Sequence, residues 1–389
     1  MKAKLFLIVF LSTVTFVHAQ SDKWYDKIHF GGYMQVRYNK LFETNPDLAC
    51  EQCDEAWGGE DGGLSLRRMR FKFYGQISPR VYFYLQPDLA KSVGETHEVA
   101  RLKDAYIDLG LDPNNEFRLR IGQSKVPYGF ENLQSSSNRL PLDRNDALNS
   151  GVKDERDLGI FFYWATSEKR ELMKELKHDG LKHSGDFGVF AFGIYNGQTA
   201  NHPDKNDKFH VVSRFSYPME VGNQVIEAGI QAYSGKFVLM ETSPDVETRD
   251  NLEYIDQRIA ASFVLYPKPL GIQAEYTIGR GPEFEKTTNA IEVRDLEGGY
   301  ITFSYLCHQW GQTIIPFSRL QYYDGGKKHE LDARSYTVHE YELGIEWQPY
   351  KAFELVAMYT FCQRRFEDLA HRNNFQEGQL LRLQAQLNF

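Results

Sequence analysis

Apolar and polar residues alternate in many segments of this chain. In the last segment every second residue from Leu381 to Phe389 is apolar, whereas the residues between them, from Arg382 to Asn388, are polar. In a β-strand, successive side chains point to opposite faces of the sheet. An alternation with a period of two therefore predicts a strand with one apolar face and one polar face.

The same alternation recurs from about residue 28 to the end of the chain, for example in segments 270–279 and 338–348. Each segment has about ten residues and is followed by a turn or loop, as in strands that cross a membrane. We count 16 such segments, an even number that places both ends of the chain on one side. The pattern predicts an all-β fold, a 16-stranded antiparallel transmembrane β-barrel.

The connections between the predicted strands alternate in length. Short turns fall near residues 77–79, 112–114, 218–223, 267–269 and 349–351, and long polar loops near 39–63, 126–156, 234–254, 280–296 and 323–335. A β-sandwich also has alternating strands, but short turns on one side and long loops on the other are typical of a membrane barrel. The terminal aromatic residue, Phe389, is also typical of outer-membrane barrels.

One connection breaks this rule. The segment from Glu168 to Asp186 lies where a short turn is expected, but it is long and charged. Leu172, Met173 and Leu176 have helical spacing, so part of the segment is predicted to be a short helix. The alternative is that the strand count is wrong at this point.

The first residues predict export. Lys2 and Lys4 precede an apolar run over residues 5–17, and Ala19 ends a small-residue cleavage site. The run is shorter than the ~20 apolar residues that a membrane-spanning helix needs. We therefore expect residues 1–19 to be a signal peptide and residues 20–389 to form the barrel.

Composition excludes some classes of protein. The net charge of −8 argues against nucleic-acid binding. Four cysteines are too few for a disulfide scaffold. We expect a local loop disulfide between Cys50 and Cys53, whereas Cys307 and Cys362 lie in predicted strands as packing residues.

Catalytic motifs are also missing from the sequence. It contains no GxSxG or HExxH motif, and most histidines fall in predicted loops. The acidic run from Glu51 to Asp61 has oxygen ligands for calcium, but such runs are more often solvated surface. We therefore expect no enzyme activity, no cofactor and no metal.

Basic residues cluster on the inward face of the early strands. A barrel of this size encloses an aqueous channel. Alternation places Arg68, Arg70 and Lys72 on the inward face of one strand, and Arg118 and Arg120 on that of another. Because rings of Arg or Lys make pores selective for anions, this wall predicts a preference for anions.

Acidic residues face the same lumen and support an alternative interpretation. The inward carboxylates are Asp88, Asp104, Asp108, Glu227, Glu275, Glu342 and Glu346. They can pair with the cations and cancel their effect. The alternatives to an anion channel are therefore a non-selective or cation-leaning general porin, and a plugged barrel that serves as an adhesin or docking protein.

Several motifs resemble one known family. The stretch from Leu66 to Arg70, the phrase Asp104-Ala105-Tyr106 and the segment GQSKVPYGFE at residues 122–131 are similar to the phosphate-selective porin O and P family. The resemblance runs from about Ile28 to Phe389. It implies a 16-stranded barrel that forms homotrimers. It also implies that the loop after GQSKVPYG, here about residues 126–154, folds inward and narrows the channel.

The predicted constriction loop carries both signs of charge. Arg139 and Arg144 lie within it and Lys125 lies at its start, but acidic residues nearly balance them. Phosphate-selective members of the family rely on a dense arginine ladder and a lysine cluster, and here the ladder is partial.

Together these features predict a passive channel in the outer membrane of a Gram-negative bacterium. It would pass small hydrophilic solutes and lean to anions such as phosphate. The predicted anion pathway consists of Arg68, Arg70, Lys72, Arg118, Arg120, Lys125, Arg139 and Arg144.

Overall fold

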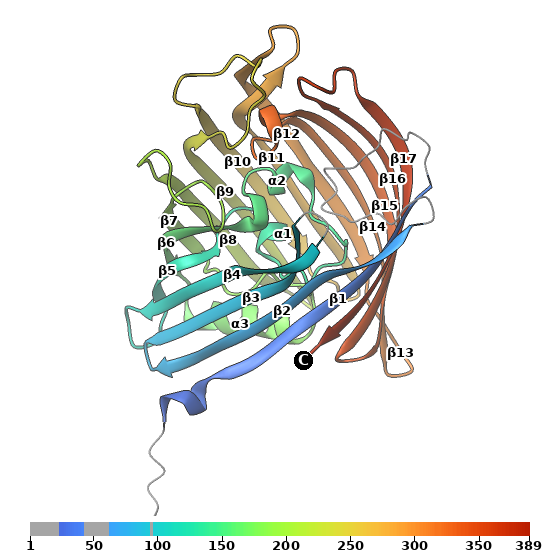
Figure 1. Ribbon diagram of the computed structural model, residues 1–389. Helices are drawn as coiled ribbons and strands as arrows, with labels where there is room; N and C mark the ends of the chain where they lie inside the picture. Colours follow the sequence, from blue (N-terminus) through green and yellow to red (C-terminus); the bar gives the residue numbers. More distant parts are fainter. Residues whose placement is uncertain (1–22, 43–61, 94–95) are drawn as a thin grey trace, which may run out of the picture.

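The computed structural model describes residues 23–42, 62–93 and 96–389, and these residues form one closed antiparallel sheet (Figure 1). Strand β1 pairs with both β2 and β17, which closes the barrel. Strands β12 and β13 both pair with β14 and share one position, so the 17 strand segments fill 16 positions. The predicted 16-stranded barrel is confirmed. The predicted signal peptide, Cys50, Cys53 and the acidic run lie outside the described residues.

The strands in chain order are β1 (His29–Leu41), β2 (Gly63–Ser78), β3 (Val81–Val93), β4 (Thr96–Gly110), β5 (Phe117–Lys125), β6 (Arg156–Trp164), β7 (Phe190–Tyr195), β8 (His210–Val221), β9 (Gln224–Val238), β10 (Glu253–Leu265), β11 (Leu270–Glu285), β12 (Ala290–Tyr305), β13 (Cys307–Gln309), β14 (Gln312–Gly326), β15 (Ser335–Tyr350), β16 (Phe353–Glu367) and β17 (Phe375–Asn388). The helices are η1 (Trp24–Lys27), α1 (Phe130–Leu133), α2 (Asp146–Asn149), η2 (Lys153–Glu155), α3 (Ser167–His178) and η3 (Leu331–Ala333).

The two faces of the strands follow the predicted alternation. In β2, Arg68 and Arg70 are buried inside the barrel, whereas Phe73 is exposed on the outside. In β17, Arg382 is buried and its neighbour Leu383 is exposed. Closure into a barrel pairs the backbone of every strand, which hydrocarbon demands because it offers no hydrogen bonds. Cys307 and Cys362 lie in β13 and β16 as predicted, and both are free thiols.

One predicted loop is wrong. Residues 280–296 form most of a long hairpin, in which β11 extends to Glu285 and β12 begins at Ala290. The polar residues there, such as Arg280 paired with Asp295 at 3.1 Å, belong to strands. Polarity alone therefore does not distinguish a loop from the part of a strand that projects beyond the apolar belt.

Two connections lie inside the barrel. The first, residues 126–155 between β5 and β6, holds α1 and α2, which lie within the barrel in Figure 1. The second, residues 165–189 between β6 and β7, holds α3 near the barrel end where the chain terminates (Figure 1). We call them the lumen loop and the periplasmic insert, because the end of an outer-membrane barrel that carries the short turns faces the periplasm. None of the described helices is long and apolar enough to span a membrane.

The periplasmic insert contains the predicted helix. In α3, Leu172, Met173 and Leu176 are buried, and the Thr166 side chain caps the N-terminus by accepting from Lys169 N–H. Leu172 and Leu176 pack with Phe130 of the lumen loop and with apolar residues at the ends of β9 and β10. The two segments therefore share one apolar cluster at the periplasmic end of the barrel.

Candidate functional site

The lumen loop crosses the barrel to the opposite wall. Glu275 on β11 accepts hydrogen bonds from the backbone N–H groups of Phe130 (2.6 Å) and Glu131 (2.8 Å). The Glu131 carboxylate pairs with Arg319 on β14 at 3.0 Å. Buried charges are stable only when they are paired and hydrogen-bonded, and these groups satisfy each other. The contacts fix the start of the loop against the acidic side of the barrel.

A second set of contacts holds the middle of the loop. Asp143 pairs with Arg37 on β1 (3.1 Å) and with Arg382 on β17 (2.5 Å). The Gln35 side chain on β1 donates to the backbone carbonyl of Ser136 at 2.9 Å. The loop is therefore attached to strands on both sides of the barrel closure.

The periplasmic insert contacts the wall formed by β9 to β16 near the periplasmic end of the barrel. Lys182 pairs with Glu346 on β15 at 2.6 Å. Burial alone would lower the pKa of Lys182, but the Glu346 carboxylate raises it, so the ammonium group stays charged. The Asn138 side chain donates to the backbone carbonyl of His183 at 2.9 Å, which joins the lumen loop to the insert.

Two further inward acids of this wall are also hydrogen-bonded or paired. Glu227 on β9 accepts from Arg214 (3.1 Å) and Tyr266 (2.5 Å). Glu342 on β15 pairs with Arg319 (2.5 Å). On the acidic wall, which we define as the inward faces of β9 to β16, these carboxylates are therefore bound by the lumen loop, by the insert or by neighbouring residues of the wall.

The opposite wall is open. A cavity of about 410 Å³ lies between the inward faces of β2 to β6, the lumen loop and the insert. We call these faces the basic wall. Seven cations and three carboxylates line the cavity: Arg80, Arg118, Arg120, Lys125, Arg156, Arg170 and Lys177, with Asp104, Asp108 and Asp186.

Three of the predicted anion-pathway residues line this cavity: Arg118, Arg120 and Lys125. Arg120 forms a bidentate pair with Asp108 (2.7 and 2.8 Å), and its guanidinium lies 3.9 Å from the ring centroid of Tyr106. Arg118 pairs with Asp186 of the insert at 2.5 Å. These pairs fix the two guanidinium groups at the cavity wall.

Lys125 and the two arginines of the lumen loop hold the loop in shape. Lys125 donates to three consecutive backbone carbonyls, those of residues 132, 133 and 134. Arg139 donates to the carbonyls of residues 141 and 142. Arg144 pairs with Glu155 at 2.7 Å. Burial alone would raise the pKa of Glu155, but Arg144 and Arg156 hold it at about 2.

The predicted anion-pathway residues of β2 lie on the basic wall but outside the lining of the cavity. Arg70 pairs with Asp88 at 2.6 Å. Arg68 donates to the Gln35 amide at 2.9 Å and has no carboxylate partner among the described residues. Lys72 lies 5.1 Å from the ring centroid of Tyr33 and, within the same ranges, also forms no ion pair. The alternative interpretation, in which lumen carboxylates neutralise the inward cations, therefore applies to Arg70 but not to Lys72.

Sequence reasoning missed several residues of the cavity. Tyr82, Tyr84 and Tyr106 line it, and so does Lys177 of the insert. The alternation that places Asp88 inward also places Tyr82 and Tyr84 inward, so the tyrosines could have been found from the sequence. Lys177 could not, because the position of α3 depends on contacts between distant segments.

Comparisons with known proteins agree with this architecture. A family model described as phosphate-selective porin O and P matches residues 54–389. Among curated proteins, none matches this sequence. Across the described ranges, no group of three or more His, Cys, Asp or Glu side chains is placed to hold a metal ion.

Several solved structures share the fold. The outer membrane channel DcaP of Acinetobacter baumannii is 13% identical with a TM-score of 0.57, over 93% of this chain and 97% of that one. An anion-selective porin from Comamonas acidovorans is 11% identical with a TM-score of 0.56, over 93% and 99%. The trimer form of OmpT from Vibrio cholerae is 8% identical with a TM-score of 0.56, over 93% and 99%.

Proposed function

The chain belongs to the phosphate-selective porin O and P family and is an outer-membrane porin, and from this premise we propose that its solutes pass along the basic wall, with anions preferred. The route is the cavity between β2 to β6, the lumen loop and the insert. The lumen loop narrows this route, since it fills the space on the opposite side. Residues 1–19 direct export and are removed.

The charge balance of the cavity is the observation that carries this proposal. Seven cations face three carboxylates there, whereas on the acidic wall Glu275 is bound to the loop, Glu346 to the insert and Glu342 to Arg319. A cleft lined by one sign of charge raises the local concentration of ions of the opposite sign. Mobile anions are therefore concentrated where the lumen is open.

The solute class follows from the same groups. Paired arginines such as Arg118 and Arg120 offer an anion their remaining N–H donors, and Arg118 Nε is buried without a hydrogen-bond partner in the described part of the chain. Phosphate and small carboxylates accept such donors. We propose small anions, phosphate among them, with other small hydrophilic solutes passing less readily. The channel needs no cofactor and no catalytic step.

A plugged barrel that serves as a docking protein is the second candidate. Two internal segments that fill the acidic half of the lumen favour it. Conductance separates the two functions, because a plugged barrel carries no steady ion current.

The test is the reversal potential of purified, refolded protein in a planar bilayer under a KCl gradient. The proposal expects a stable conductance that prefers chloride. A stable conductance that prefers potassium would discard the anion preference and keep the channel. The absence of conductance from folded barrels would favour the docking function.

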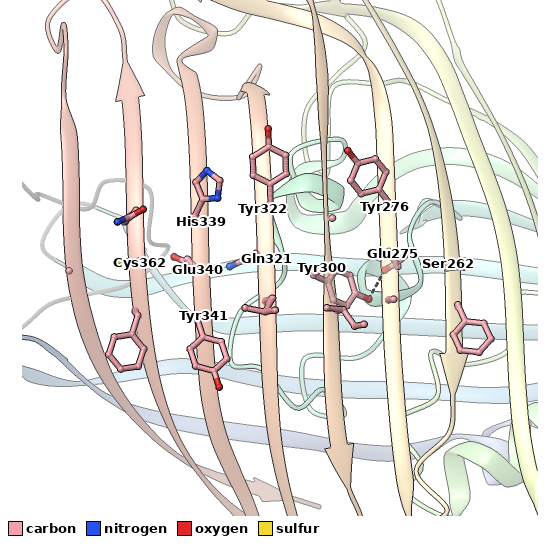
Figure 2. Close-up of a pocket in the computed structure, with 18 of the residues that line it drawn as sticks. Ser262, Glu275, Tyr276, Tyr300, Gln321, Tyr322, His339, Glu340, Tyr341 and Cys362 are labelled. Carbon is pink, nitrogen blue, oxygen red and sulfur yellow. Dashed lines mark hydrogen bonds between the residues drawn. The ribbon is translucent and has the colours of Figure 1, made fainter.

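We also propose that the channel is a homotrimer and that the outer face of β10 to β17 contacts a second copy. A groove of about 960 Å³ lies there, with Ala261, Ala274 and Gly299 among its lining residues. The rings of Tyr276 and His339 point to this outer face (Figure 2). Hydrocarbon does not solvate polar groups, and small residues allow two walls to approach closely.

The trimer is tested by the double substitution Ala261→Trp with Ala274→Trp, which fills the groove. We expect the trimer band on a semi-native gel to disappear while the monomer keeps the heat-modifiable mobility of a folded barrel. Ala105→Trp, on the outer face of β4, is the control and should leave the trimer intact. A trimer lost only in the control variant would place the interface on the other side.

A further inference from the structure

Three tyrosines form a row across the basic wall. Tyr74 on β2 is in register with Tyr84 on β3, which is in register with Tyr106 on β4. The rings of Tyr84 and Tyr106 are stacked, with centroids 5.3 Å apart and an interplanar angle of 15°. The rings of Tyr74 and Tyr84 lie 6.1 Å apart. The row is therefore a continuous aromatic surface about three strands wide.

The row ends at Tyr106. The next residue in register is Gly122 on β5, which has a φ of +129° and no side chain. A Cβ at this position would lie 2.3 Å from the backbone oxygen of Ala105, so the site requires glycine. At this end of the row the Tyr106 ring therefore lies beside the backbone of β5 and against the Arg120 guanidinium, which is 3.9 Å from the ring centroid.

A structural role explains only part of this tyrosine row. Tyr106 supports the Arg120 guanidinium at 3.9 Å, which accounts for one ring. All three tyrosines remain partly exposed inside the barrel, and Tyr84 and Tyr106 line the cavity. A route for inorganic ions alone needs charges and water. Aromatic ring edges along it indicate a solute that has an aromatic part of its own.

Two cations near the row have no carboxylate partner. Lys72 precedes Tyr74 by two positions on β2, so both side chains face the lumen. Lys177 of α3 lines the cavity, is exposed, and is close enough to Lys72 for the two like charges to repel. Neither forms an ion pair within the described ranges. An anionic group between them would relieve the repulsion.

From this geometry we propose that the row of Tyr74, Tyr84 and Tyr106 is a binding site for aromatic carboxylates. The ring of the solute packs against the lumen-facing edges of the tyrosine rings, and its carboxylate lies between the ammonium groups of Lys72 and Lys177. A cavity of about 410 Å³ has the size of an ordinary small-molecule site. The site rests on the proposed function, since it names the solute class that the anion route takes up.

The test is block of the chloride current by sodium benzoate in a planar bilayer. Cyclohexanecarboxylate has the same charge without an aromatic ring, acetate has the charge alone, and glucose is an uncharged ring. We expect benzoate to block at a concentration about 3- to 10-fold lower than cyclohexanecarboxylate, the factor that one aromatic contact contributes. Equal block by benzoate and cyclohexanecarboxylate, or by glucose and benzoate, would overturn the site.

Substitutions of the tyrosines and lysines test whether they form the binding site. Tyr84→Leu with Tyr106→Leu should remove the benzoate advantage and leave block by acetate unchanged. The matched control is Tyr82→Leu, which changes a tyrosine that lines the same cavity but lies outside the stacked row. Lys72→Gln with Lys177→Gln should weaken block by benzoate and acetate alike. Loss of the benzoate advantage in the Tyr82 variant alone would also overturn the site.

Two readouts keep this proposal separate from the channel itself. Heat-modifiable gel mobility reports whether each variant folds. Quenching of tyrosine fluorescence by benzoate in detergent reports binding without any current. A chloride-selective channel with neither block nor quenching overturns the binding site alone. Quenching in a barrel that does not conduct overturns the channel and keeps the site.

Discussion

The basic wall and the acidic wall of the lumen both carry many charged groups but differ in what covers them. On the acidic wall, Glu275 and Glu346 are bound by the lumen loop and the insert. On the basic wall, Arg118 and Arg120 border an open cavity. The sign of the charges on a wall therefore does not by itself decide selectivity. Selectivity depends on which charges still face mobile solute.

Removal of the insert should reduce the difference between the two walls most. Trp164 and Val189 are already joined by a backbone hydrogen bond of 2.7 Å, so a short Asn-Gly turn can replace residues 168–186. We expect single-channel conductance to rise at least about twofold, because the insert borders the cavity and its removal widens the route. The chloride preference should fall, because Glu346 loses Lys182 and the cavity loses Arg170 and Lys177. An unchanged conductance would show that the insert does not border the route.

Charge reversal on the basic wall is the next largest effect. The double substitution Arg68→Glu with Arg120→Glu should swing the reversal potential from chloride towards potassium, since the second change puts a new carboxylate beside Asp108 at the cavity. The control is Arg280→Glu with Arg365→Glu, which changes the net charge equally on outward faces. If both double variants shift the potential by the same amount, general surface charge rather than the wall sets selectivity.

Acid should loosen the lumen loop. The pKa of Glu155 is held at about 2 by Arg144 and Arg156, below its ordinary value of ~4.3. A depressed carboxyl pKa stabilises the fold above the ordinary value and loses that contribution as the pH falls through the lower one. The contribution is about 3 kcal/mol at neutral pH. We expect current noise from loop motion to increase between about pH 4 and pH 2.

Glu155→Gln serves as the reference for that experiment. It should show the noisy current already at pH 7, with little further change on acidification. A variant that is as quiet as the wild type at neutral pH would mean that the Arg144–Glu155 pair does not hold the loop.

The smallest effect is expected at Lys72. This lysine has no ion pair among the described residues, so Lys72→Gln removes a charge without leaving a carboxylate unpaired. The chloride preference should fall slightly with no loss of conductance, measured by reversal potential. Asp88→Asn is the contrasting variant, because it leaves the buried Arg70 without its partner at 2.6 Å. It should reduce the yield of folded barrel.

Alternation in the sequence predicted the barrel and the inward faces correctly. It placed Arg68, Arg120 and Glu346 inside because strand parity is a local property. It could not show that Lys182 covers Glu346, or that Glu275 binds the backbone of residues 130 and 131, because these contacts join segments far apart in the chain. The helix in the insert was predicted, but its place inside the barrel was not.

Because contacts between distant segments cannot be read from strand alternation, two residues that hold the loop were assigned to the anion pathway. From the sequence, Lys125 and Arg139 look like constriction residues, yet both donate to backbone carbonyls and hold the loop. Their role in the anion pathway stays a prediction. The extended hairpin at residues 280–296 was missed because its exposed polar residues resemble those of a loop.

The central claim is that solutes travel along the basic wall and not along the acidic wall. Its most direct test is cysteine accessibility during current recording, with the four native cysteines replaced by serine. One new cysteine is placed on the basic wall (Tyr82→Cys) and another on the acidic wall (Ser262→Cys). A negatively charged methanethiosulfonate reagent should block current through the first variant and leave the second unaffected. Block of the Ser262 variant with no effect on the Tyr82 variant would contradict the account.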